Sequence, residues 1–567
     1  MIFGHHAVSA RATRHRRALG ISSAAVVAAG LLPAAAAAPV PAAAEAPTPT
    51  SAPATLKSTA PVWPQPGAQV PATPTLRWTK CDEPDFDKLH LQCATVKVPL
   101  DYARPGRASI LLNVVRHKAK AKKAKGSVFV NPGGPGTSAS SRMEMFMEAL
   151  GKPITSQFDV VGMDPRGIGV DSQASCWSKQ DAPGKPDGFP LSAAEAKQQI
   201  VRDTFERKAC DKVGHPIIDH MSTGDVARDM ELMRQAVGDP QLSYYGVSYG
   251  TVLGSTYAAM FPSKVRALIL DGVVDPVDWT TGKPGESDRI PSSARTGSGR
   301  GADESLRALF AACKAAGPKK CKHGASIASE WNQLMTRLAK GPVKTKEHTF
   351  TKAETISSAM ENLYSPDQAT SFMDWIHDEY LTVVKKTPRA VNRPKTTGLV
   401  PPGLAVVKPG PVVSPVTGYA DHAKWIDTFR QAGVICADGV NPKDPMAWHT
   451  YATQSAKTSW FTPLWTWQSS LCAGWPGAHS GAYWGPFNVK PAHPLLVIGN
   501  THDPATPLAN AKAVAAMSPG ARLLTLDAFG HAAGGKSVCV TKAMQNYLLT
   551  GALPASGLVC KDAKPIF

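Results

Sequence analysis

The sequence of 567 residues contains no C-x-x-C pair and no H-x-x-x-H cluster, spacings at which cysteine and histidine commonly bind zinc. It also lacks a basic helix, a zinc finger and a basic patch interleaved with aromatic residues, the usual signatures of nucleic-acid binding. We therefore expect no metal, no other cofactor and no nucleic-acid partner. A lysine-rich run over residues 118–125 lies between two strand-like segments and is interpreted as a solvated hairpin loop.

The N-terminal region also lacks a convincing membrane span. Its alanine-rich run over residues 18–32 is interrupted by glycine and serine and follows four arginines between positions 11 and 17. Small residues at positions 34–38 offer an A-x-A cleavage site, so residues 1–38 are predicted to be a signal peptide for general secretory or twin-arginine export. No cysteine lies near that site, so we expect a secreted, extracellular protein without a lipid anchor or stable membrane association.

Export has two consequences for the mature chain. It removes four arginines and no acid, so the formal net charge falls from +18 to +14, a positive balance that would suit an anionic cell-wall partner. It also places ten cysteines in an oxidising compartment, where their even number and close spacing predict disulfides between sequence neighbours. The expected pairs are Cys81–Cys93, Cys176–Cys210, Cys313–Cys321, Cys436–Cys472 and Cys539–Cys560.

Residues 39–75 are rich in alanine, proline, threonine and serine and are predicted to be a disordered linker or pro-segment. Residues 76–275 then alternate strand-like and helix-like segments, which is the pattern of a mostly parallel sheet covered by helices. A polar excursion over 176–215 is expected to be closed by one of the disulfides. Strands are expected over 94–100, 110–117, 127–130, 158–164, 241–245 and 265–270, and helices over 222–238 and 251–261.

Residues 276–491 depart from this pattern and are predicted to form an inserted, largely helical cap domain. The sheet is expected to resume in residues 492–567, which gives a core in two parts. Cap helices are expected over 303–316, 325–340, 352–363, 368–385 and 420–432, with a proline- and valine-rich passage at 399–416. Six tryptophans near the end of the insert are expected to form mostly its own core, with some of them walling a substrate pocket: Trp448, Trp460, Trp465, Trp467, Trp475 and Trp484.

The segment Tyr244–Thr251 organises the first part of the core. It reads as the end of a buried strand, a Gly-x-Ser-x-Gly turn and the start of a small-residue helix, which is the pattern of a nucleophile elbow. Such a strained turn needs small residues two positions before and after the serine, and Gly246 and Gly250 satisfy that need. Ser248 is therefore predicted to be a catalytic nucleophile.

An N-P-G-G-P-G loop over residues 131–136 follows an earlier buried strand, in the order that an α/β-hydrolase requires. Glycines after a strand let backbone amides approach a ligand closely, and such amides can bind an oxyanion. The predicted donors are the amides of Tyr249 and of Gly134, or of its neighbour Gly133.

A serine hydroxyl becomes a good nucleophile only when a base takes its proton, and that base needs an acid to orient it. In α/β-hydrolases the order is Ser, Asp or Glu, then His, each following a strand. Among the histidines after Ser248, only His531 lies just beyond the last expected strand. Asp503 follows the preceding strand and is the predicted acid, with Asp271, one strand earlier, as the first alternative and Asp527 as the weaker one.

Together these motifs resemble the secreted tripeptidyl aminopeptidases of actinomycetes, which are α/β-hydrolases related to proline iminopeptidases. The resemblance covers residues 76–567 and implies release of short peptides, typically tripeptides, from free N-termini by Ser248, Asp503 and His531. It rests on N-P-G-G-P-G at 131–136, F-D-V-V-G-M-D-P-R-G at 158–167, G-V-S-Y-G-T at 246–251, D-P-A-T-P at 503–507 and G-H at 530–531.

Such an enzyme needs an anion to hold the substrate ammonium, because a desolvated charge without a partner is costly. Related enzymes carry an acidic residue immediately before a cap cysteine, where this chain has Ile435 before Cys436, and Asp438 is the nearby substitute. The prediction is a secreted serine exo-peptidase. An esterase or other acyl hydrolase on the same scaffold is the alternative, and a catalytically silent cell-wall-associated binding protein is a third reading. The sequence predicts no oligomeric state.

Overall fold

The computed structural model describes residues 70–387, 389–391, 394, 423–427, 429–562 and 564–567. The chain divides into two units, 1–57 and 58–567, and all described residues belong to the second. The predicted signal peptide, most of the predicted linker and the proline- and valine-rich passage therefore lie outside the described residues.

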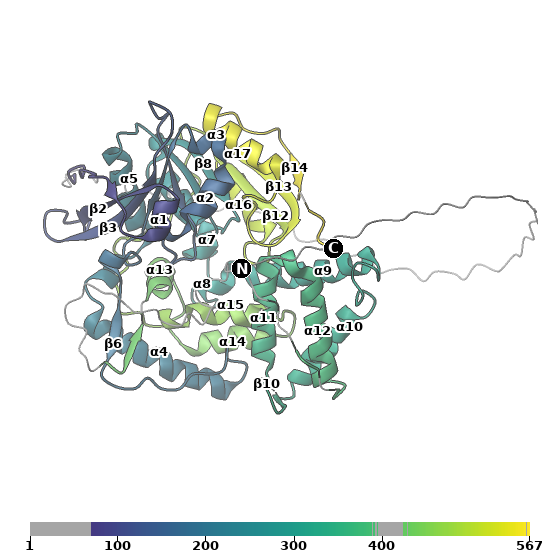
Figure 1. Cartoon of the computed structure of the whole chain (residues 1–567). Helices are drawn as coiled ribbons and strands as arrows, with labels where there is room; N and C mark the ends of the chain where they lie inside the picture. Colours follow the sequence, from purple (N-terminus) through teal and green to yellow (C-terminus); the bar gives the residue numbers. More distant parts are fainter. Residues whose placement is uncertain (1–69, 388, 392–393, 395–422, 428, 563) are drawn as a thin grey trace, which may run out of the picture. The chain divides into compact units, whose positions relative to one another are not determined.

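Ten strands of the described chain form one sheet, which contains the predicted strands of both parts of the core (Figure 1). The strands are Thr79–Lys80 (β1), Leu91–Pro99 (β2), Ser109–His117 (β3), Ser127–Asn131 (β4), Asp159–Met163 (β5), Leu242–Val247 (β7), Val265–Asp271 (β8), Leu496–His502 (β12), Arg522–Phe529 (β13) and Val559–Lys561 (β14). Their spatial order is β1-β2-β3-β5-β4-β7-β8-β12-β13-β14. Neighbours are antiparallel from β1 to β5 along this order and parallel from β5 to β14, so the sheet is mostly parallel, as predicted.

Helices cover both faces of this sheet, and its central strands β7 and β8 are therefore buried on both sides. Consecutive residues of β7 show this arrangement, since Tyr244 packs into the apolar cluster of one face and Tyr245 into that of the other. The first face carries helices α5 (Thr223–Ala236), α6 (Gly250–Met260) and α16 (Leu508–Met517). The second face carries helices α2 (Met143–Leu150), α3 (Lys152–Thr155) and α17 (Val538–Thr550).

The lysine-rich run at 118–125 is not a hairpin loop, and that prediction was wrong. β3 and β4 are consecutive in sequence, but β5 lies between them in the sheet. The run instead lies along the segment that leads into β5: the amide of Ala119 donates to the carboxylate of Asp159, and the amide of Ala121 donates to the carbonyl of Ser156. Strand order in a sheet depends on pairing over long distances, which the local pattern of residues does not contain.

The described residues between β8 and β12 lie outside the large sheet and are largely helical. Helices α9 to α12 lie beside one another (Figure 1) and share an apolar cluster that includes the fully buried Trp331, Trp375 and Trp448. We call residues 276–491 the cap, and these boundaries stay a prediction. The cap helices are Pro276–Trp279 (α7), Ser292–Arg295 (α8), Ser298–Ala316 (α9), Ile327–Leu338 (α10), Lys352–Tyr364 (α11), Ala369–Val383 (α12), Arg430–Asp438 (α13), Met446–Ser455 (α14) and Thr462–Thr466 (α15).

The polar excursion at 176–215 contains a long helix, α4 (Ala193–Val213), whose start is fixed by a capping box between Ser192 and Glu195. This helix contacts α14 and the 3-10 turn Trp467–Cys472 that follows α15. The excursion therefore packs with the cap, although it belongs in sequence to the first part of the core.

A short strand contradicts the helix predicted over 420–432. Residues Trp425–Asp427 form β11, which pairs antiparallel with β6 (Cys176–Ser178), and α13 begins only at Arg430. Trp425 also packs edge-on against Phe205 of α4. These tertiary contacts override the local helical pattern.

All five predicted disulfides are present in the described chain. They are Cys81–Cys93, Cys176–Cys210, Cys313–Cys321, Cys436–Cys472 and Cys539–Cys560, and they close loops with sequence separations from 8 to 36 residues. Such bonds are typical of proteins that fold in oxidising compartments, which is consistent with the expected extracellular location. No helix among the described residues is long and apolar enough to cross a bilayer.

Candidate active site

Ser248 lies in the turn between β7 and α6, where the sheet's parallel strands end. Its backbone φ is 60°, in the left-handed region that residues with a side chain rarely adopt. The Ser248 amide donates to the carbonyl of Asp271 at 2.9 Å, and Thr251 Oγ1 donates to the Ser248 carbonyl at 2.6 Å. The G-x-S-x-G sequence thus forms the strained turn that it predicts.

The two glycines around Ser248 have no room for a side chain. A Cβ at Gly246 would lie 2.4 Å from the carbonyl oxygen of Gly250, and a Cβ at Gly250 would lie 2.6 Å from the carbonyl oxygen of Asn131. Both distances are far shorter than ordinary van der Waals contact, so the turn requires glycine at both positions.

The glycine loop at 131–136 lies directly against the elbow. A Cβ at Gly133 would lie only 2.9 Å from the amide nitrogen of Tyr249. The amide of Gly133 donates to the side chain of Asn131 at 2.9 Å, whereas Gly134 lines the cavity beside Ser248. Of the two glycines predicted as alternative oxyanion donors, Gly134 is therefore the better placed.

His531 follows β13, and its Nδ1 lies 3.0 and 2.9 Å from the two carboxylate oxygens of Asp503. The carboxylate also accepts from the amides of Ala505 and Thr506, both at 2.9 Å. Burial alone would raise the pKa of Asp503, but the charge and hydrogen bond of His531 and these two amides hold that pKa below its ordinary value. An ionised Asp503 requires the proton of a neutral His531 to sit on Nδ1.

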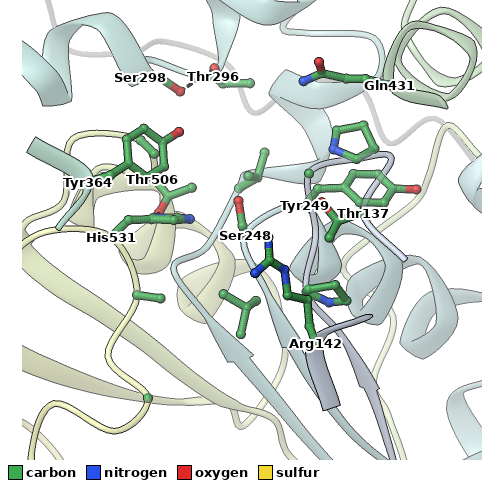
Figure 2. A pocket seen from close by; sticks show the side chains of 18 of the residues that line it. Thr137, Arg142, Ser248, Tyr249, Thr296, Ser298, Tyr364, Gln431, Thr506 and His531 are labelled. Atoms are coloured by element: carbon green, nitrogen blue, oxygen red, sulfur yellow. Dashed lines mark hydrogen bonds between the residues drawn. The ribbon is translucent and has the colours of Figure 1, made fainter. Parts of the chain in front are cut away.

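The other ring nitrogen of His531, Nε2, is buried and has no hydrogen-bond partner within the described residues. Figure 2 shows the imidazole pointing across the cavity toward Ser248. A buried nitrogen without a partner costs free energy, and active sites are places where such a cost is tolerated. With the proton on Nδ1, Nε2 holds the lone pair that can accept the Ser248 proton.

The two alternative acids bind elsewhere. Asp271 accepts from the hydroxyl of Tyr245 at 2.8 Å and from the amides of Ala533 and Gly534 at 2.8 and 2.9 Å, so it anchors the loop that follows the histidine. Asp527 accepts from Thr501 Oγ1 at 3.1 Å on the exposed side of the strand ends. These contacts favour Asp503 as the partner of the histidine.

A cavity of about 210 Å³ lies above Ser248, between the core and the cap. Trp465 lines it, in keeping with the expectation that some cap tryptophans wall a pocket. Figure 2 shows Thr296, Ser298 and Gln431 on the cavity wall that faces Ser248. Trp279 also lines the cavity, and the sequence did not single it out because its position depends on how α7 packs.

Asp438, the predicted amine-binding residue, is buried and does not line this cavity. Its carboxylate accepts from the amide and hydroxyl of Thr223 and, at 2.9 Å, from the indole of Trp279. Burial raises the pKa of Asp438 to about 6, although these hydrogen bonds act in the opposite direction. Asp438 thus lies one side chain behind the cavity wall, where it joins α13 of the cap to α5 of the core.

Two cationic residues that the sequence did not single out also line the cavity, namely Arg142 and Lys536. Arg142 precedes α2, and Lys536 follows the histidine loop. Neither belongs to a recognisable motif, so only the fold brings them to the site. Among the described residues, no group of three or more His, Cys, Asp or Glu side chains is arranged to hold a metal ion.

The fold and this site define a member of the α/β-hydrolase class. A family model for the alpha/beta hydrolase fold matches residues 126–292, and a model for TAP-like proteins matches residues 457–560. The two matches cover the elbow in the first part of the core and the histidine loop in the second. The protein is therefore a serine hydrolase.

Three relatives show which family of α/β-hydrolases the chain is similar to. The serine protease Hip1 of Mycobacterium tuberculosis is 30% identical over 82% of this chain and 87% of its own length. The tripeptidyl aminopeptidase of Streptomyces coelicolor is 28% identical over 83% of each chain, and carboxylesterase B of Mycobacterium tuberculosis is 29% identical over 87% of this chain and 91% of its own. The chain belongs to the family of α/β-hydrolases that contains Hip1 and the tripeptidyl aminopeptidases, as the sequence motifs indicated.

Proposed function

We propose that this protein is a serine exo-peptidase that releases short peptides, such as tripeptides, from free N-termini, with Ser248, His531 and Asp503 as its catalytic residues. The main support is the orientation of His531. Asp503 holds Nδ1 with both carboxylate oxygens, and this leaves the buried Nε2 directed toward the serine of a strained elbow. The peptide class is supported by two relatives that are named as peptidases.

In the first half of the proposed reaction, His531 Nε2 takes the proton of Ser248 while Oγ attacks the scissile carbonyl carbon. The carbonyl oxygen becomes an oxyanion, and the amides of Tyr249 and Gly134 donate to it. The protonated His531 then gives its proton to the leaving nitrogen, and the C–N bond breaks. The C-terminal part of the substrate departs as a free amine, and the N-terminal part stays bound to Ser248 as an ester. Asp503 stabilises the transient imidazolium and keeps Nδ1 protonated.

In the second half, water replaces the leaving group. His531 takes one proton from the water while the water oxygen attacks the carbonyl carbon of the acyl-serine. The same amides donate to the second oxyanion. Collapse of this intermediate breaks the ester bond, and His531 returns the proton to Ser248 Oγ. The products are a peptide with a new carboxylate and the unchanged enzyme.

An acyl hydrolase that acts on neutral esters is the second candidate. The described residues that line the cavity include no Asp or Glu to pair with a substrate ammonium, and Asp438 already accepts three hydrogen bonds behind the wall. Backbone carbonyls and the hydroxyls of Ser293, Thr296 and Ser298 would then have to hold the amine in a peptidase. The relative named carboxylesterase B is about as similar in sequence to this chain as the two relatives named as peptidases.

Covalent labelling tests the nucleophile. A fluorophosphonate probe should label the wild-type protein once, and Ser248→Ala should abolish the label. Ser255→Ala is a matched control, because Ser255 is a buried serine of α6 beyond the elbow, and its loss should leave labelling unchanged. Stoichiometric labelling of Ser248→Ala would contradict the assignment.

Substrate turnover separates the two candidates. Tripeptidyl anilides with a free amine, the same compounds with a blocked amine and short-chain nitrophenyl esters should be compared at equal concentration. Cleavage that requires the free amine supports the exo-peptidase. Equal cleavage of blocked and free anilides contradicts exo-peptidase action, and turnover of esters alone rejects the peptidase in favour of the second candidate.

A further inference from the structure

The charges of the cavity are one-sided. Its lining contains two cationic side chains, Arg142 and Lys536, and no carboxylate among the described residues. Asp503 and Asp271 are fully buried behind the histidine loop and accept hydrogen bonds from groups of that loop. The described side chains with a fixed charge that line the cavity are therefore both cationic.

The side chain of Lys536 is held in place by backbone carbonyl groups of the histidine loop. Its ammonium donates to the carbonyl oxygens of Phe529 and His531, at 3.3 and 3.1 Å, and so braces the loop that carries the histidine. Burial lowers the pKa of Lys536, with the carboxylates of Asp503 and Asp271 acting in the opposite direction. This lysine is better placed to orient His531 than to bind substrate.

Arg142 has a different position. It is the last residue of the 3-10 turn Ser140–Arg142, directly before α2, and Figure 2 shows its side chain directed toward Ser248. A guanidinium presents five N–H donors in a planar fork, so it can hold a protein partner and a substrate carboxylate at the same time. Hydrogen bonds between a guanidinium and a carboxylate are among the stronger ones in proteins because both groups are charged.

We propose that Arg142 binds a carboxylate of the substrate beside the scissile bond and so makes the enzyme prefer substrates that carry negative charge there. This inference rests on the proposed function only in taking Ser248 as the position of the reacting bond. Two parts of a peptide can supply the carboxylate: an acidic side chain on the acyl side, or the C-terminal carboxylate of a short leaving group. In the second case the enzyme acts best on short oligopeptides.

Two pairs of substrates distinguish these sources. On the acyl side, tripeptidyl anilides with Glu or Gln before the scissile bond differ only in charge. On the leaving side, a tetrapeptide with a free C-terminus is compared with its C-terminal amide. We expect kcat/KM to favour the charged member of at least one pair by about 10- to 100-fold, the range for a charge-assisted hydrogen bond.

Variants of Arg142 test whether this residue causes the preference. Arg142→Gln should reduce the ratio of kcat/KM for charged over neutral substrate to near one, because the charged members lose more kcat/KM than the neutral ones. Arg142→Lys should restore part of the ratio, because lysine keeps the charge without the fork. Arg107→Gln, in an exposed turn between β2 and β3, is the matched control and should leave the ratio unchanged.

A ratio that is the same in the wild type and Arg142→Gln, for both pairs, would overturn the inference. An equal loss for charged and neutral substrates would show a structural role and would also overturn it. Calorimetric binding of the acid and amide tetrapeptides to Ser248→Ala protein, with and without Arg142→Gln, requires no turnover. The charge preference is therefore measurable even if another residue proves to be the nucleophile.

Discussion

Asp503 contacts Nδ1 of His531 through both of its carboxylate oxygens, at 2.9 and 3.0 Å, and no other described carboxylate forms a hydrogen bond with this ring. Asp503→Asn should therefore lower kcat by roughly 10³- to 10⁴-fold, because an amide nitrogen facing Nδ1 favours the wrong tautomer. Steady-state kinetics on the best substrate, with circular dichroism to verify folding, measures this effect.

Asp271→Asn is the control for that variant. Asp271 is equally buried on the neighbouring strand, but it accepts from Tyr245 and from two amides of the loop after His531. We expect some loss of stability and a fall in kcat of only about tenfold, since the histidine keeps its own acid. A larger loss of kcat in Asp271→Asn than in Asp503→Asn would reverse the two roles.

Substitution of Gly133 tests whether the glycine loop must lie close to the elbow for catalysis. Its φ is 86°, and a Cβ there would lie 2.5 Å from the carbonyl oxygen of Val247 and 2.9 Å from the amide nitrogen of Tyr249. Gly133→Ala should displace the loop and disturb the proposed oxyanion donors, which lowers kcat by roughly 10²- to 10³-fold. The measurement is the rate constant of acylation, followed by the release of the aniline or nitrophenol leaving group.

Gly238→Ala matches this change without the steric clash. Gly238 has a similar φ of 82°, but a Cβ there would meet no atom within 4 Å. The variant should lose about 1 kcal/mol of stability from backbone strain and keep its kcat. Equal activities of the two variants would show that the loop's distance from the elbow does not matter for catalysis.

The sequence predicted the parts of this protein that local pattern and chain order determine. The G-x-S-x-G turn has the expected strain at Ser248, the five cysteine pairs are those of sequence neighbours, and His531 and Asp503 were brought together by strand order alone. These features follow from short spacings or from the fixed topology of the fold.

Features that depend on tertiary packing were missed. The position of β5 between β3 and β4 made the lysine-rich run something other than a hairpin, and pairing with β6 turned part of a predicted helix into β11. Arg142, Lys536 and Trp279 line the cavity, and only the fold brings them there from distant parts of the sequence. Asp438 was a reasonable candidate by sequence position, but the packing of α13 against α5 directs its carboxylate away from the cavity.

Arg166 and Asp229 form a buried ion pair on which the stability of the core depends. The guanidinium donates to both carboxylate oxygens at 2.7 Å and to the carbonyls of Pro99 and Leu100 at 2.9 and 2.7 Å, and both side chains are fully buried. Arg166→Met should lower the free energy of unfolding by about 3–5 kcal/mol, because it leaves Asp229 charged and buried without its partner. Urea unfolding followed by tryptophan fluorescence measures the change.

The surface pair of Arg104 and Asp101 provides the comparison. It has a similar distance of 2.8 Å, but the arginine side chain is 62% exposed, so Arg104→Gln should cost less than about 1 kcal/mol. The double variant Arg166→Met, Asp229→Asn should recover part of the loss, since it removes the unpaired charge. A loss in Arg166→Met no larger than in Arg104→Gln would contradict this account.

The raised pKa of Asp438 implies that the stability of the protein depends on pH. Burial raises its pKa in the folded protein to about 6 from an ordinary value of 3.8, so the fold favours the protonated carboxyl. Its stabilising contribution is fully present below pH 3.8 and is lost as the pH rises through about 6. The difference in unfolding free energy between the wild type and Asp438→Asn should therefore fall by about 2 kcal/mol between pH 4 and pH 7. Other titrating groups affect both proteins equally and cancel in this difference.

Urea unfolding of both proteins at pH 4, 5, 6 and 7 measures this difference. A second readout concerns the oxyanion residue, because the hydroxyls of Thr223 and Tyr249 lie 2.5 Å apart and Thr223 also contacts Asp438. Loosening of that network in Asp438→Asn should lower kcat more than it raises KM, since Tyr249 supplies an amide of the proposed oxyanion hole. A difference in stability that stays constant from pH 4 to pH 7 would contradict this account, because it would mean that burial does not raise the pKa of Asp438.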